Sequence, residues 1–143
     1  MPSWSEVEAQ APELAARARA LFEARKHKTL ATLRRDGSPR ISGIEAEFRE
    51  GELTFGSMLN GIKALDLQRD PRFALHSASE DPPGWKGDAK VAGVVEEVES
   101  QGESHLFRAD VKELAVVYLG HPADHLVIES WHEGRGVTRR ERR

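Results

Sequence analysis

The sequence contains no cysteine among its 143 residues, and this absence removes a whole class of chemistry. Disulfides, thiolate nucleophiles and cysteine-ligated zinc are excluded. No apolar run approaches the ~20 residues that a membrane-spanning helix needs, so we expect no membrane association. The first residues, MPSWSEVEAQ, lack a basic segment followed by an apolar run. We therefore expect no signal peptide and a cytoplasmic protein.

Strong charge of one sign is also lacking. The net charge is −3 at pH 7, which gives no general basis for nucleic-acid binding. Hydrophobic residues make up 38% and charged residues 31% of the chain, as in a globular protein with a modest core. The length suits a single domain covering 1–143. A modest core gains from burying a further face, which favours a dimer.

Residues 26–78 carry the most informative pattern. Asp36-Gly37 lies between two strand-like runs and is a strong hairpin signal, because glycine adopts the positive φ that hairpin turns need. Glu50-Gly51 predicts the next turn. The strands predicted in this region span 27–34, 40–48, 52–57 and 72–79.

The second of these strands does not alternate cleanly. Ile44, Ala46 and Phe48 share one face, whereas Ile41 falls on the other. The slip occurs at Ser42-Gly43, which suggests either a bulge or a close approach of the backbone to another group. The alternative without a ligand is a bend at a barrel corner.

A short helix is predicted over 60–67, with Asn60 as its N-cap and Asp70-Pro71 ending it. Lys63 falls in its first turn, where a cation opposes the helix dipole unless an anion is present. Lys63, a capping side chain and free N–H groups together form a candidate anion site. The alternative is a solvated surface lysine.

The rest of the chain predicts further helices and strands around this unit. An amphipathic helix over 12–25 begins at Pro12, and Gly93 predicts a bend in a strand over 89–98. Ser100 and Glu103 have the spacing of a capping box, which predicts a helix carrying Leu106, Phe107, Val111 and Leu114. The remaining predicted segments are a last strand over 124–132, closing a barrel over 27–132, and a basic tail over 133–143.

Several single residues leave alternatives open. Trp85 is either a packing plug or a lid that stacks on a ring, and Trp131 packs at a dimer interface or lines a groove. Arg135 or Arg139 could reach an anionic ligand, or the tail is simply a solvated strand. His121 and His125 have Pro122 between them, so we expect no metal site.

The runs TLATLRRDGSPRISGIEAEF and ELTFGSMLNGIKALDLQRDPRFALHSA resemble the pyridoxamine 5'-phosphate oxidase-like family of FMN-binding split β-barrel proteins. Within that family they are most similar to the small actinobacterial flavin/deazaflavin oxidoreductases. The resemblance covers roughly residues 20–100. It implies a mainly β fold with flanking helices, namely a six-stranded split β-barrel. It also implies a homodimer with the cofactor in a groove at the interface.

The resemblance also implies site residues. A basic residue at the position of Lys63 holds the cofactor phosphate, together with the strand end at Gly56, Ser57 and Met58. The ring system lies along the second strand at Arg40, Ile41 and Ser42. Many relatives carry a second cation near the lysine, for which this chain offers only Arg40.

The function implied is that of an oxidoreductase dependent on FMN or on the deazaflavin coenzyme F-420. It would transfer hydride to or from a small conjugated substrate, and reduction is the favoured direction. The catalytic residue is unassigned, with His76 as a candidate proton donor. The alternative is a non-catalytic binding or carrier protein for a flavin, a deazaflavin or haem. A third possibility is a barrel with an empty groove.

Overall fold

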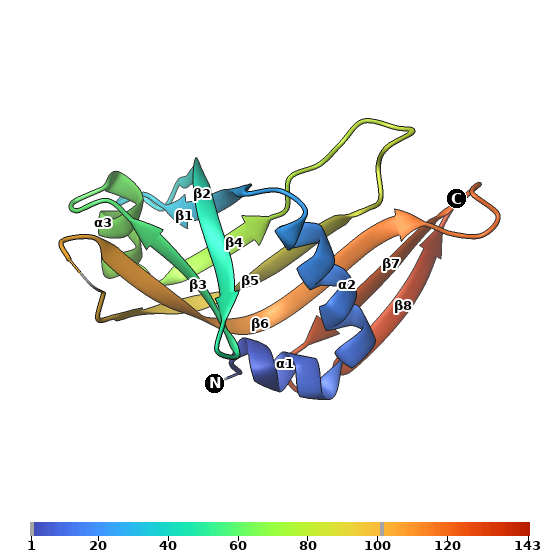
Figure 1. The fold of residues 1–143 in the computed structure, drawn as a ribbon, viewed down its shortest axis with the longest axis horizontal. Coiled ribbons are helices and arrows are strands. Elements are labelled where there is room, and N and C mark those ends of the chain that lie inside the picture. The colour runs from blue at the N-terminus through green and yellow to red at the C-terminus, as the bar shows by residue number, and fades with distance from the viewer. Residues whose placement is uncertain (1, 101) are drawn as a thin grey trace.

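The computed structural model describes residues 2–100 and 102–143 as a mainly β protein. Figure 1 shows a strongly curved sheet with two N-terminal helices across its middle and a third helix beside its left end. The helices are α1 (Trp4–Gln10), α2 (Pro12–Glu23) and α3 (Ile62–Arg69). The strands are β1 (His27–Leu33), β2 (Pro39–Arg49), β3 (Glu52–Ser57), β4 (Arg72–His76), β5 (Asp88–Val98), β6 (His105–Leu119), β7 (Leu126–His132) and β8 (Gly136–Arg142).

Six of the strands close into an antiparallel barrel. Their order is β3-β2-β1-β4-β5-β6, and pairing of β3 with the first part of β6 completes the ring. The second half of β6 stays paired with β5 on one edge and pairs on its other edge with β7, which pairs with β8. In Figure 1 these last two strands extend to one side of the barrel. The six-stranded split barrel implied by the resemblance is therefore confirmed, with β7 and β8 as an extension.

The barrel core is filled by aromatic and aliphatic side chains from the inward faces of the strands. Phe55 lies at its centre, with ring centroids 5.5 Å from Phe73 and 6.2 Å from Phe107. At the end covered by α1 and α2, the Trp4 ring lies 4.7 Å from that of Phe48. Burial of these rings supplies much of the hydrophobic stabilisation of a chain with few aromatics.

The N-terminal helices form for reasons visible in the sequence. Pro12 is the first residue of α2, where its missing N–H is not needed. Ser3 caps α1 by accepting a hydrogen bond from the Glu6 amide. None of the helices in the described ranges is both long and apolar enough to cross a membrane.

Two sequence-based predictions about strands were wrong, and one alternative is excluded. The segment expected to be a helix after residue 103 is β6, and its capping box includes Gln101, which lies outside the described residues. The strand expected over 124–132 is β7, which lies outside the barrel that it was expected to close. The bulge that was one of the alternatives at Ser42-Gly43 does not occur, because β1 and β2 pair without a break from Pro39 to Glu45.

Two smaller predictions also need correction. Gly61, not Asn60, is the N-cap of α3, and Asn60 has a positive φ of 58°. Trp131 neither faces a groove nor is available to an interface, because it is fully buried and its indole N–H donates to Gln10 of α1. The bend expected at Gly93 is confirmed as a shift in the β5–β6 register between Ala92 and Gly93.

Candidate functional site

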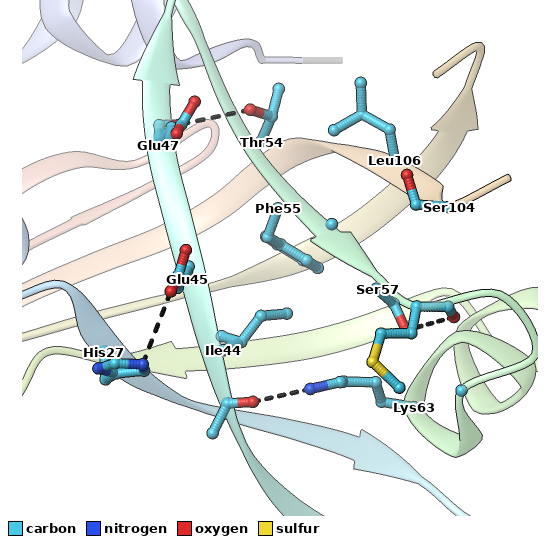
Figure 2. Close-up of a pocket in the computed structure, with 14 residues that line it drawn as sticks. His27, Ile44, Glu45, Glu47, Thr54, Phe55, Ser57, Lys63, Ser104 and Leu106 are labelled. Atoms are coloured by element: carbon cyan, nitrogen blue, oxygen red, sulfur yellow. Dashed lines mark hydrogen bonds and ion pairs between the residues drawn. The ribbon is translucent and has the colours of Figure 1, made fainter. Parts of the chain in front are cut away.

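The barrel is split where β2 and β3 separate. The two strands pair from Arg49↔Glu52 to Ala46↔Phe55, next to the turn that joins them. Beyond Ala46, β2 continues along β1, while the end of β3 pairs with β6 as far as Ser57↔His105. The edge of β2 around Gly43 and the last residues of β3 therefore face each other without pairing (Figure 2).

A hollow of about 640 Å³ lies at this separation, within the roughly 300–1,000 Å³ typical of ligand sites. We call it the split hollow. Its apolar floor is formed by Ile44 and Phe55, and polar side chains surround that floor (Figure 2). The complete lining is His27, Gly43, Ile44, Glu45, Glu47, Thr54, Phe55, Gly56, Ser57, Met58, Gly61, Lys63, Ser104 and Leu106.

Lys63 joins the two sides of the split. It is the second residue of α3, and its Nζ donates to the carbonyl oxygen of Gly43, 2.7 Å away. The Gly43 carbonyl therefore points away from β1, and in an extended strand the N–H of the same residue points the same way. Gly43 thus presents a donor and an acceptor to the hollow, and its missing side chain leaves this edge uncovered.

The opposite wall combines the end of β3 with the start of α3. Ser57 is buried, and its hydroxyl donates to the Met58 carbonyl at 3.2 Å. A Cβ on Gly61 would lie 2.6 Å from the Ser57 hydroxyl, so glycine is needed for this close approach. No side chain in the described ranges caps α3, whose first N–H groups lie beside Ser57 and Lys63. Donors and one cation therefore gather at one end of the hollow, which suits an anion.

The structure brings together four of the seven site residues expected from the sequence. Gly56, Ser57, Met58 and Lys63 all line the split hollow. Arg40, Ile41 and Ser42 do not line it and lie further along β2, toward the β1–β2 turn. Of these three, Ile41 is 73% exposed, on the outer face of the strand.

Arg40 is held by a buried carboxylate on α3. Its Nε donates to Asp66 Oδ2 at 2.7 Å, and Asp66 also accepts from the Thr32 hydroxyl at 2.8 Å and from Arg69 at 2.9 Å. Burial opposes ionisation of Asp66, but the hydrogen bonds from Arg40, Thr32 and Arg69 outweigh it and lower the pKa of this carboxyl. Arg40 therefore ties α3 to β2, and Lys63 is the cation that faces the hollow.

The sequence analysis did not identify the acidic side chains at the other end of the split hollow, Glu45 and Glu47. Gly43, Glu45 and Glu47 are alternate residues of β2, so both glutamate side chains lie on the same, outer face of the strand. His27 pairs with Glu45 in register, and its Nε2 lies 3.6 Å from Glu45 Oε1 (Figure 2). The parity of the glutamates was visible in the sequence, whereas the position of His27 depended on the β1–β2 register.

The remaining residues of interest lie away from the split hollow. His76 Nδ1 is 2.6 Å from the Ser77 carbonyl oxygen, and His76 is not part of the lining. His125 is buried and contacts Asp124, with 2.8 Å between Nδ1 and Oδ1. Within residues 2–100 and 102–143, no three histidine or acidic side chains are grouped as metal ligands would be. The basic tail forms β8, in which Arg139 pairs with Glu129 and Glu141.

Comparison with known proteins identifies the fold and leaves the activity open. No family model matches the chain, and no curated protein matches it in sequence. A pyridoxamine 5'-phosphate oxidase-related, FMN-binding protein from Nostoc punctiforme has a similar structure, with a TM-score of 0.65 and 13% identity over 92% of this chain and 94% of that one. The chain therefore has the split β-barrel fold of pyridoxamine 5'-phosphate oxidase-related proteins.

Two further similar structures differ in what they bind. A haem-binding protein from Mycobacterium smegmatis has a TM-score of 0.62 and 14% identity over 90% of this chain and 87% of its own. A protein described as an F420 reductase has a TM-score of 0.56 and 18% identity over 67% of this chain and 94% of its own. Proteins with this fold thus include flavin-binding, deazaflavin-dependent and haem-binding members.

Proposed function

We propose that the chain binds FMN or the deazaflavin F-420 in the split hollow and acts as an oxidoreductase on a small conjugated substrate. The observation that carries the proposal is the meeting of Lys63, Ser57 and the β2 edge at Gly43, which no strand that the structure describes pairs with, around one hollow of ligand size. Lys63 and the start of α3 suit the phosphate, and the β2 edge suits the polar rim of a planar ring.

The chemistry of the lining fits such a cofactor. An ammonium group has three donors, and Lys63 uses one of them on Gly43, so two remain for phosphate oxygens. The apolar floor of Ile44 and Phe55 matches the face of a flat ring, while the Gly43 N–H and carbonyl match its hydrogen-bonding edge. A bound flavin or deazaflavin supplies hydride transfer, and the protein binds and orients it.

The acidic end of the split hollow gives the proposed enzyme its titratable groups. His27 and Glu45 are adjacent to each other there, and Glu47 lies further along the same strand face. These side chains are on the side away from Lys63, so a phosphate at Lys63 leaves them facing the space where a substrate would approach. The proposed mechanism assigns them to substrate contact, and Lys63 and Ser57 to cofactor binding.

We further propose that a second copy of the chain covers this region. Ile41, Met58, Leu59, Ile62 and Leu65 are large apolar side chains exposed beside the split hollow, and Met58 is 81% exposed. The Arg40–Asp66 and Lys63–Gly43 bonds hold β2 and α3 together, so these residues lie on neighbouring segments. Several large apolar side chains exposed on neighbouring segments favour an interface.

Light scattering tests the proposed homodimer. The expected mass is that of two chains, and Ile62→Asp should give a monomer, because it puts a charge among these exposed apolar side chains. Exposed Val137→Asp on β8 is the matched control and should leave the mass unchanged. A monomeric parent protein would contradict this part of the proposal.

A non-catalytic carrier is the second candidate function. The observation that favours it is that Arg40 is engaged by Asp66, so Lys63 is the cation that the lining offers to a phosphate. A single cation suits reversible binding, and the similar haem-binding structure supports a carrier role for this fold.

Turnover of a reduced flavin or deazaflavin with conjugated acceptors distinguishes the enzyme from the carrier. Hydride transfer faster than the uncatalysed rate supports the enzyme, and tight binding without turnover supports the carrier.

A further inference from the structure

A second hollow of about 880 Å³ lies between α2, the start of β1 and the β4–β5 loop. We call it the loop hollow. His27 lines both this hollow and the split hollow, so the two are neighbours on the surface, but their other lining residues differ. Its volume lies within the range of roughly 300–1,000 Å³ found for small-molecule sites.

The loop hollow has an aromatic wall held in place by a hydrogen bond. Trp85 is half-buried in the β4–β5 loop, and its indole N–H donates to Asp88 Oδ1 at 3.0 Å. This bond satisfies the polar atom of the ring and limits its rotation, which leaves the ring to contact a ligand. Ala20 and Leu21 of α2, its C-cap Ala24 and Ala78 of the loop complete the apolar part of the lining.

The charge of the loop hollow is opposite to that of the whole protein. Four of its lining residues are cations, namely Arg17, Arg25, Lys26 and Lys86. Glu80 is the one carboxylate in the lining. The chain as a whole carries a formal charge of −3, so this local excess of positive charge is specific to the site. Such a concentration of one sign in a concave site attracts ligands of the other sign.

The cations differ in how far they are already paired. Arg25 is paired with Glu80, the Arg17 guanidinium lies 4.0 Å from the centre of the Tyr118 ring, and Lys26 is 3.6 Å from Glu45. Lys86 is exposed beside Trp85 and makes no ion pair with any residue that the structure describes. A ligand carboxylate at Lys86 and Arg25 would therefore lie at the edge of the aromatic wall.

We propose that the loop hollow is a binding site for a small aromatic carboxylate. The ring of the ligand packs on Trp85 and Leu21, and its carboxylate is bound by Lys86 and Arg25. A hollow of this size, bounded by a helix, a strand and a loop, accommodates one small molecule rather than a polymer. The inference is independent of the proposed function, because no part of it requires a cofactor in the split hollow.

Trp85 itself reports on the test. The protein has three tryptophans, and Trp4 and Trp131 are fully buried, so Trp85 is the one a ligand in the loop hollow can touch. In ¹⁵N–¹H spectra the missing indole signal of Trp85→Phe identifies the Trp85 resonance. The protein is then titrated with naphthalene-2-carboxylate, with the neutral naphthalene-2-carboxamide and with inorganic phosphate.

The expected result is a saturable shift of the Trp85 signal by the carboxylate, with at least about tenfold weaker binding of the amide because it lacks the charge. Lys86→Gln should weaken carboxylate binding about three- to tenfold, whereas Lys112→Gln, an exposed lysine outside the hollow, should not change it. Lys63→Ala should also leave carboxylate binding unchanged.

Four results would overturn the inference. These are the absence of a saturable shift, equal binding of amide and carboxylate, an equal effect of phosphate, and loss of carboxylate binding in Lys63→Ala. The second result would indicate a merely apolar hollow and the third a general anion site. The fourth would indicate that the acid binds in the split hollow instead.

Discussion

Lys63 Nζ lies 2.7 Å from the carbonyl oxygen of Gly43, across the gap where β2 and β3 separate. This bond fixes the position of the cation at the rim of the split hollow before any ligand is present. It also uses the hydrogen-bonding edge of β2 that β3 leaves unpaired. The proposed cofactor site therefore depends on the strand separation as well as on the lysine.

Lys63→Ala should weaken cofactor binding about 10- to 100-fold, because a hydrogen bond to a charged group contributes roughly 1.5–3 kcal/mol. Isothermal titration with FMN and with the deazaflavin measures the effect. Lys90→Ala, an exposed lysine on β5 that lines neither hollow, is the matched control. Unchanged affinity in Lys63→Ala would make Lys63 a structural tether of β2 rather than a phosphate ligand.

Asp66→Asn should lower the free energy of unfolding by about 2–4 kcal/mol at pH 7, because two arginines and Thr32 lose their charged acceptor in a largely buried site. Denaturant unfolding measures the loss. Asp81→Asn, in the exposed β4–β5 loop, is the control and should have little effect. A loss no larger than that of the control would mean that the network does not hold α3 on the barrel.

The stability contributed by Asp66 should depend on pH in a defined direction. Its pKa is lowered in the folded protein from an ordinary value of 3.8, so the folded state favours the ionised carboxylate. The contribution is therefore fully present above about pH 4 and is lost as the pH falls through the lower, folded pKa. The difference in unfolding free energy between the wild type and Asp66→Asn should shrink below pH 4. A difference that grows with acid would contradict the assignment.

Gly93→Ala should destabilise the barrel strongly. A Cβ at this position would lie 2.0 Å from the Asp110 carbonyl oxygen on β6, so the β5–β6 pair would have to move. We expect a loss of roughly 2–4 kcal/mol, in the range of severe packing mutations, measured by thermal unfolding. Gly43→Ala is the control, since nothing lies within 4 Å of the added methyl group. Equal stability of the two variants would show that β6 adapts at the bulge.

The helix predicted in place of β6 has a physical cause in the residue pattern of that strand. In a regular strand, Phe107 and Val111 would point to one face of the sheet and Leu114 to the other. All three side chains are nevertheless buried. The register moves from Gly93↔Val111 to Ala92↔Glu113, so Lys112 is an extra residue that reverses the alternation. Buried residues four and then three apart imitate a helix, and only the pairing with β5 reveals the bulge.

The opposite error occurred in β2. Ile41 broke the alternation and suggested a bulge, but the strand is regular and Ile41 is exposed on its outer face. A single sequence cannot distinguish an apolar residue exposed on a regular strand from one displaced by a bulge. The turns at Gly37 and Gly51 were predictable, because both have the positive φ that glycine favours.

The candidate site was predictable where it depends on local sequence. Gly56, Ser57, Met58 and Lys63 are close in the chain, and the strand-to-helix connection brings them together. His27 and Glu45 are far apart in the chain and meet only through the β1–β2 register. The loop hollow needs α2 and the β4–β5 loop to lie side by side, which no local pattern encodes.

The central claim is that the split hollow binds the phosphate end of a flavin or deazaflavin through Lys63. The most direct measurement is a fluorescence titration of the purified protein with FMN and with F-420, run in parallel on Lys63→Ala. The account predicts saturable binding of at least one of the two, weakened at least about tenfold in the variant. Absence of binding of both by the wild-type protein, or equal binding by the variant, would contradict it.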